Sequence, residues 1–276
     1  MPIVIAHRGA SGYRPEHTLA AYELGARQGA DYIEPDLVCT RDGELVARHE
    51  NEISGTTDVA EHPEFADRRT AKEIDGKAYE GWFAEDFTLA ELKTLRARER
   101  LPDVRPDNAA HDGEYEIPTL REVIDLAERL GVGIYPETKH PAHHRALGLA
   151  LEPRLVEALN GTAVPVFVQS FDPSSLRELA GELDVPFVQL VGSGPVDLEA
   201  IAGYAQAIGP AKQLVDAELV AAAHAAGLAV HPYTFRREPR FLPDGVPDLA
   251  AELRIHYELG VDGVFTDNPD VAVAVR

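Results

Sequence analysis

The sequence predicts a (β/α)8 TIM barrel, an α/β fold in which eight parallel strands alternate with helices. A short run rich in β-branched residues is followed by an amphipathic helical run, and this pair recurs eight times in 276 residues. Strands that alternate with helices indicate parallel pairing through βαβ crossovers, and eight such units suit a barrel of this length. A doubly wound open sheet is the structural alternative. It usually has a glycine-rich phosphate turn after its first strand, and no such turn follows the first strand here.

The elements are expected in the following order. The strands begin near residues 3, 32, 132, 166, 187, 207, 229 and 263. The helices are expected over 17–28, 119–130, 145–159, 173–183, 198–204, 217–226, 249–259 and 269–275. Thr119 and Glu122 form a capping box at the start of the second of these helices. Asp172 and Asn268 each precede a proline, so each side chain is expected to cap the helix that follows.

Residues 51–117 interrupt this rhythm with 26 charged residues out of 67. We interpret them as an insertion in one βα loop, after the second strand region, within a single barrel domain of residues 1–276. A structureless loop of that length would be unusual. Thr88 and Glu91 would cap a short helix in it, and a small core would form around Trp82, Phe83 and Phe87. The segment would lie at the barrel mouth and shape a substrate pocket. The alternative is a solvated decoration without a role in the site.

The charge balance excludes two classes of partner. With 26 basic and 47 acidic residues the formal net charge is −21. A surface of this sign repels nucleic acid and anionic membranes, so neither nucleic acid nor a stable membrane association is expected. A phosphate ligand would have to be bound by a metal or by a few placed cations. The oligomeric state is left open.

The location expected from the sequence is cytoplasmic. Cys39 is the only cysteine, which excludes an intrachain disulfide and fits a reducing compartment. The chain begins with an apolar strand-like run and without a signal-peptide pattern, so a periplasmic or secreted location is expected only if such a peptide has been removed. The longest stretch without charged residues, 219–235, is too polar and too broken to span a bilayer.

Three carboxylates are expected to meet at the barrel mouth. Residues i and i+2 of a strand face the same side, as Glu34 and Asp36 do near the end of the second strand. Glu137 lies near the end of the third strand. Barrel enzymes build their sites from the carboxyl ends of strands. An all-oxygen cluster of this kind favours a hard cation, Ca²⁺ or Mg²⁺, over zinc.

Two histidines and two cations complete the expected constellation. His7 ends the first strand and is followed by Arg8, while His49 follows a strand-like run after the turn at residues 42–43. A pair of histidines can divide the work of general base and general acid. Arg8 and Lys139 would supply positive charge to a phosphate.

Ordinary explanations exist for each of these residues taken alone. A Glu-x-Asp pair on a strand is usually a surface or salt-bridged feature, a lone histidine is usually a satisfied polar residue, and Glu137 with Lys139 could be a plain ion pair. The functional interpretation rests on convergence. All these residues fall at or just beyond expected strand ends, while the other strand positions are mostly apolar.

In several motifs the chain resembles the glycerophosphodiester phosphodiesterase family. They are His7-Arg8-Gly9-Ala10, Pro15-Glu16-His17-Thr18, Ile33-Glu34-Pro35-Asp36-Leu37, Leu45-Val46-Ala47-Arg48-His49, Tyr135-Pro136-Glu137-Thr138-Lys139, Val168-Gln169-Ser170-Phe171-Asp172, His231-Pro232-Tyr233-Thr234 and Gly260 through Asp267. Each is weak alone, but they run in order across nearly the whole chain. The branch most similar is that of the bacterial periplasmic glycerophosphodiesterases. The chain departs from the family at Glu50, where aspartate is usual, and at Tyr233, where many relatives have tryptophan.

The resemblance implies a (β/α)8 barrel that hydrolyses a glycerophosphodiester to glycerol 3-phosphate and an alcohol. It implies that one divalent cation, Ca²⁺ or Mg²⁺, is held by Glu34, Asp36 and Glu137. It implies that His7 and His49 are the acid–base pair, with His49 favoured as the proton donor to the leaving alcohol. The implied substrate-binding residues are Arg8, Lys139, Gln169, Phe171 and Tyr233.

Two other functions remain compatible with the sequence. A lysophospholipase D would use the same site on lipid-like substrates, although the acidic surface and the lack of an apolar amphipathic face argue against membrane docking. A catalytically silent barrel that binds glycerophosphodiesters is the alternative from another class. The presence of both histidines argues against it.

Overall fold

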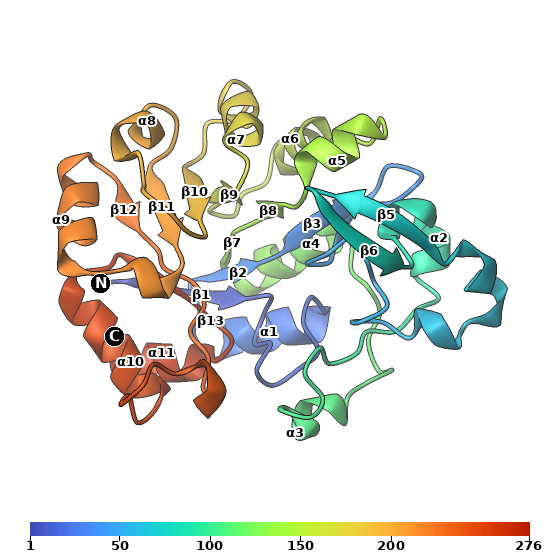
Figure 1. Cartoon of the computed structure of the whole chain (residues 1–276), viewed down its shortest axis with the longest axis horizontal. Helices are drawn as coiled ribbons and strands as arrows, with labels where there is room; N and C mark the ends of the chain where they lie inside the picture. The colour runs from blue at the N-terminus through green and yellow to red at the C-terminus, as the bar shows by residue number, and fades with distance from the viewer.

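The expected (β/α)8 barrel is confirmed by a computed structural model that describes all residues, 1–276 (Figure 1). Two arcs of parallel strands form the barrel wall, in the strand orders β13-β1-β2-β7 and β12-β11-β10-β9-β8-β3. The Ile134–Val166 and Phe235–Thr266 bridges, both parallel, join the two arcs into a closed ring. No helix is long and apolar enough to cross a membrane.

The elements have the following bounds. The strands are β1 Ile3–His7, β2 Tyr32–Glu34, β3 Asp36–Cys39, β4 Leu45–Ala47, β5 Thr70–Ile74, β6 Lys77–Gly81, β7 Gly133–Ile134, β8 Glu137–Thr138, β9 Val168–Ser170, β10 Phe187–Val191, β11 Ala207–Pro210, β12 Ala229–Val230 and β13 Gly263–Thr266. The α-helices are α1 Leu19–Arg27, α2 Leu89–Leu92, α3 Pro106–Ala109, α4 Leu120–Leu130, α5 Pro141–Ala146, α6 Leu151–Leu159, α7 Pro173–Ala180, α8 Leu198–Ala202, α9 Ala217–Ala225, α10 Leu249–Leu259 and α11 Pro269–Val275.

Prolines divide two of the barrel strands. Pro35 separates β2 from β3, and Pro136 separates β7 from β8, because proline has no N–H to give to the ladder. Pairing continues across both breaks, since the Glu137 N–H donates to the Pro35 carbonyl at 2.9 Å. Each divided pair therefore serves as one of the eight strands of the barrel. Glu34 lies directly before the first break, and Asp36 and Glu137 lie directly after the breaks.

The barrel interior is filled below the site by a small apolar cluster of five buried residues: Ile5, Tyr135, Val188, Ala207 and Phe265. A larger core lies between the strands and the surrounding helices. The packed interior makes the barrel a core and not a pore, and the main cavity lies at its carboxyl end.

Residues 51–117 lie between β4 and α4 and extend to one side of the barrel, where the β5–β6 hairpin is the most prominent element (Figure 1). Their apolar side chains pack on those of β3 and β4 in a separate cluster of ten buried residues: Val38, Val46, Ile53, Val59, Phe65, Ala84, Phe87, Leu92, Leu95 and Ile117. The division into one domain with an insertion stays a prediction.

Two local expectations were wrong. The helix expected over 145–159 is two helices, α5 and α6, because Gly148 adopts a positive φ of 74° and ends the first one. Asn268 does not cap α11, because its side-chain oxygen accepts a hydrogen bond from the backbone N–H of Arg237 at 3.1 Å. The capping boxes at Thr119 and Thr88 are both present as expected.

Candidate active site

The strand register places the predicted polar residues in one layer at the carboxyl end of the barrel. His7 pairs with Glu34 across β1 and β2, and Asp36 pairs with Glu137 across β3 and β8. Glu137 in turn pairs with Gln169 on β9. Side chains far apart in the chain are thereby neighbours in the ring.

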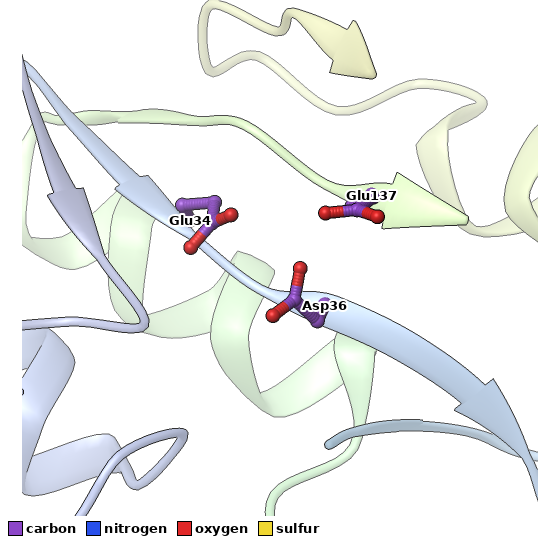
Figure 2. Close-up of side chains that lie close together, drawn as sticks. All are labelled: Glu34, Asp36 and Glu137. Atoms are coloured by element: carbon purple, nitrogen blue, oxygen red, sulfur yellow. The ribbon is translucent and has the colours of Figure 1, made fainter. Parts of the chain in front are cut away.

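The three carboxylates lie together as expected, with ligand oxygens within 4.8 Å of one another (Figure 2). All three side chains are buried. The two Glu34 oxygens accept hydrogen bonds from the backbone N–H of Arg8 at 2.7 Å and from Nε2 of Gln169 at 2.9 Å. Glu137 binds Lys139 Nζ at 2.8 Å. These bonds orient the carboxylates of Glu34 and Glu137 from outside the cluster.

The cluster fits a divalent cation. Oδ1 of Asp36 is buried without a hydrogen-bond partner. Burial, together with the neighbouring Asp36 and Glu137, raises the pKa of Glu34 well above its ordinary value. Burial also raises the pKa of Glu137 to about 8, although Lys139 opposes the shift. Joint ionisation of the three carboxyls is therefore unfavourable unless further positive charge is supplied, and the donors are all oxygens, as Ca²⁺ and Mg²⁺ require.

His17 is a residue whose role the sequence interpretation missed. Its Nε2 lies 2.9 Å from Oδ2 of Asp36, and its Nδ1 lies 2.7 Å from the Tyr22 hydroxyl. Burial lowers the pKa of His17, so the ring is neutral at pH 7. The neutral ring then donates from Nε2 to Asp36 and accepts from Tyr22 at Nδ1, which orients the carboxylate. No periodic pattern marks His17, because it lies in the loop before α1 with φ at 55°.

His7 is held by a carboxylate that carried no role in the sequence interpretation. Its Nδ1 lies 2.6 Å from Oδ1 of Asp267, the residue that follows β13. Burial and the nearby Arg8 lower the pKa of His7 to about 4, so the ring is neutral at pH 7. Nδ1 then carries the proton, and Nε2 is free to accept one. The position of Asp267 at a strand end, next to β1 in a closed barrel, was the available signal.

His49 has the same arrangement. Its Nδ1 lies 2.5 Å from Oε1 of Glu50. Burial and the positive charges of Arg8 and Lys139 lower its pKa to about 3. The glutamate that departs from the family pattern therefore provides the histidine with its carboxylate partner.

Arg8 and Lys139 are the cations nearest to the cluster. Arg8 Nη1 lies 3.1 Å from Glu16 Oε2, and its Nε lies 3.4 Å from Asp36 Oδ2. Both side chains are buried, and the neighbouring carboxylates raise their pKa values, so both remain charged. Arg8 has a φ of 58°, a conformation that is strained for arginine and that the site holds in place.

Aromatic side chains form part of the cavity wall. The ring of Phe171 meets the ring of Tyr233 edge-on at 6.0 Å, and Phe171 is 47% exposed. All ten predicted site residues line the same cavity of about 510 Å³: His7, Arg8, Glu34, Asp36, His49, Glu137, Lys139, Gln169, Phe171 and Tyr233. Gln169 also bonds Glu34, so it supports the acidic cluster as well as the wall.

Known proteins are similar to this chain in sequence and in fold. The model of the glycerophosphoryl diester phosphodiesterase family matches residues 7–271. A glycerophosphodiester phosphodiesterase of Arabidopsis thaliana is 35% identical and aligns with 96% of this chain and 83% of the relative. One of Bacillus subtilis is 31% identical, with 99% and 86% covered. The solved structure of an Oleispira antarctica phosphodiesterase in complex with the product sn-glycerol-3-phosphate is 26% identical, has a TM-score of 0.74 and covers 100% of this chain and 96% of that chain.

Proposed function

The chain belongs to the glycerophosphoryl diester phosphodiesterase family, and from this membership we propose that it hydrolyses small glycerophosphodiesters. It is a phosphoric diester hydrolase, and the proposed substrates are molecules such as glycerophosphocholine and glycerophosphoethanolamine, which yield glycerol 3-phosphate and an alcohol. One observation carries the proposal. Two neutral histidines, each with a carboxylate on Nδ1, line the same cavity as three clustered carboxylates and two cations. The cytoplasmic location stays a prediction.

Glu34, Asp36 and Glu137 are proposed to hold one divalent cation, Ca²⁺ or Mg²⁺. The partnerless Asp36 oxygen and the raised pKa values of Glu34 and Glu137 support this assignment. When bound, the cation would stabilise negative charge on the phosphoryl oxygens and orient glycerol oxygens. Arg8 and Lys139 are proposed to bind the phosphate beside it.

His7 is proposed as the base of the first step and His49 as the acid. Nε2 of His7 takes the proton of the glycerol hydroxyl next to the phosphate as that oxygen attacks phosphorus. The bond from phosphorus to the alcohol breaks, and Nε2 of His49 donates a proton to the alcohol oxygen. This role requires that the bound anionic phosphate raise the low pKa of His49, because a nearby negative charge favours the protonated imidazole.

The second step exchanges these roles. The first step leaves a cyclic glycerol phosphate. Nε2 of His49 takes a proton from water, whose oxygen attacks the phosphorus of this cyclic phosphate. The bond from phosphorus to the glycerol oxygen breaks, and His7 returns its proton to that oxygen. The product is glycerol 3-phosphate, and both rings regain their initial protonation states. A requirement for a neighbouring hydroxyl explains a preference for glycerol headgroups.

Release of glycerol 3-phosphate from glycerophosphocholine tests the proposal. His7→Ala and His49→Ala are each expected to lower kcat by about 10²-fold or more, and EDTA is expected to abolish turnover. His224→Ala is the matched control, because that imidazole pairs with Asp262 at the surface. Near wild-type turnover in either site variant would remove that histidine from the mechanism, and full activity in stripped protein would remove the metal.

The two alternative functions have their own readouts. Faster turnover of lysophosphatidylcholine than of glycerophosphocholine would favour the lysophospholipase D. Tight binding of intact glycerophosphocholine with no turnover in any divalent metal would favour the silent binding protein. We expect neither result.

A further inference from the structure

Both carboxylates that hold the histidines also bind an arginine, and both arginines come from the charged segment 51–117. Arg100 reaches the partner of His49, and Arg105 reaches the partner of His7. The two arginines are five residues apart, in the stretch between β6 and α4 that includes α3. The proposed mechanism assigns them no role.

Arg100 forms a two-pronged bond with Glu50. Its Nη1 lies 2.9 Å from Oε1 and its Nη2 lies 2.6 Å from Oε2 of that carboxylate. The same guanidinium binds Glu16 at 2.9 and 2.7 Å. Planar forks of this kind fix a carboxylate in orientation as well as in position. Glu50 is thus held with its Oε1 on the imidazole of His49.

Arg105 makes a single bond to Asp267, on an oxygen that Arg236 Nε also contacts at 2.9 Å. Nη2 of Arg105 lies 2.6 Å from Oδ2, while the other oxygen of Asp267 bonds His7. Nη1 donates to the Ser11 carbonyl at 2.9 Å, and Nε binds Glu238 at 2.5 Å. The Arg105 side chain is 7% exposed, so these bonds lie out of bulk water.

The stretch that carries both arginines is itself held in place. The Arg98 N–H donates to the Thr56 carbonyl at 2.9 Å, and the Leu101 N–H donates to the Glu99 side chain at 2.8 Å. The Arg105 N–H donates to the Leu101 carbonyl at 2.8 Å, which closes a turn between the two arginines. Both arginine side chains therefore project from one hydrogen-bonded stretch of backbone, which fixes the directions in which they point.

We propose that Arg100 and Arg105 are positioning residues, each of which fixes the carboxylate partner of one catalytic histidine. The charged segment then serves catalysis through two chains of contact, Arg100–Glu50–His49 and Arg105–Asp267–His7. This inference rests on the proposed function, because it assumes that the two histidines act on substrate.

A double-mutant cycle tests the Arg100 chain. Arg100→Ala is expected to lower kcat for glycerophosphocholine by about 10- to 100-fold, as is typical for outer partners of active-site groups. The loss is expected to shrink to about two-fold or less in a His49→Ala background, because the group that Arg100 positions is gone. It is expected to persist in a His7→Ala background. Arg98→Ala is the matched control from the same stretch, because Arg98 binds only Glu61 among carboxylates.

The Arg105 chain is tested by the mirror cycle. The loss in kcat from Arg105→Ala is expected to vanish in a His7→Ala background and to persist with His49→Ala. Arg105→Lys replaces it if the alanine variant fails to fold, as judged by thermal unfolding. The Arg100 side chain is 30% exposed, so its truncation is not expected to prevent folding. The Arg100 cycle therefore tests the positioning role even if no Arg105 variant folds.

The outcomes separate this inference from the proposed function. Absence of wild-type turnover would contradict the proposed function and the positioning role with it. Normal wild-type turnover, with an Arg100→Ala loss equally large with and without His49, would contradict only the positioning role. A kcat within about two-fold of wild type in folded Arg100→Ala would contradict it as well.

Discussion

At the scale of single residues, the distinctive feature of His7 is its tautomer. Asp267 accepts from Nδ1, so the free nitrogen is Nε2. The charge of Arg236, the hydrogen bond from His7 and the charge of Arg105 outweigh burial and lower the pKa of Asp267 well below its ordinary value, which keeps the carboxylate ionised. In the proposed mechanism, an ionised partner would stabilise the imidazolium that forms when His7 takes a proton.

We expect Asp267→Asn to lower kcat for glycerophosphocholine by about 10²-fold with a small change in KM, because a neutral amide cannot stabilise the imidazolium. Steady-state kinetics on folded protein measures this. Asp270→Asn is the control, since Asp270 bonds only the Tyr13 hydroxyl near the surface. Unchanged kcat in Asp267→Asn would show that the carboxylate has no part in the proton transfer.

Seven of the ten site residues could be named from the sequence because they follow a rule of position, whereas Gln169, Phe171 and Tyr233 were implied only by the family resemblance. Glu34, Asp36 and Glu137 lie at strand ends with period-two spacing, and the barrel brings such ends together. Asp267 obeys the same rule and could have been named. His17 does not follow this rule, since it acts from a loop residue with positive φ through a contact to Asp36, and the motif at residues 15–18 was its only signal.

At the scale of elements, the strand–helix alternation predicts the barrel because each strand is short and apolar and each helix has an apolar face. The split between α5 and α6 was missed because a single residue, Gly148, decides it against an otherwise continuous helical pattern. The contacts of segment 51–117 with the site could not be predicted from the sequence either, because they depend on how a turn directs the side chains of Arg100 and Arg105.

Glu99, which lies just before that turn and accepts from the Leu101 N–H, is expected to make stability depend on pH. Burial raises the pKa of its carboxyl to about 7, so the folded protein favours the protonated form. The stabilisation is present below about pH 4.5 and is lost as the pH rises through about 7, by about 3 kcal/mol.

We therefore expect Glu99→Gln to be more stable than wild type at pH 8 and similar at pH 4.5. The amide can keep the bond from the Leu101 N–H and can pair with the Asn108 side chain, whose oxygen has no partner. Urea unfolding at both pH values measures the difference. Glu80→Gln, at an exposed pair with Arg69, is the control. Equal stability of wild type and Glu99→Gln at pH 8 would contradict the assignment.

At the scale of the whole molecule, the net charge of −21 opposes the approach of an anionic diester. In the proposed site, Arg8 and Lys139 would attract the phosphate only at short range, while the charge of the surface acts over about 10 Å at 0.1 M salt. The encounter with an anionic substrate is therefore opposed by the acidic surface, while binding in the site is favoured by the two local cations.

Raising NaCl from 10 to about 150 mM is expected to increase kcat/KM a few-fold for glycerophosphoglycerol, whose net charge is negative. The increase is expected to be smaller for zwitterionic glycerophosphocholine, which has no net charge to repel. Initial rates at saturating divalent cation measure both. A decrease with salt for glycerophosphoglycerol would show that the local cations control the encounter.

The assignment of the acidic cluster as a cation site is the claim on which the rest depends, and calorimetric titration of chelator-treated protein tests it without any assay of activity. We expect Ca²⁺ or Mg²⁺ to bind wild type at one site, and Glu137→Gln to bind at least 10-fold more weakly because an anionic ligand is lost. Absence of binding by wild type, or equal affinity in wild type and Glu137→Gln, would contradict the account.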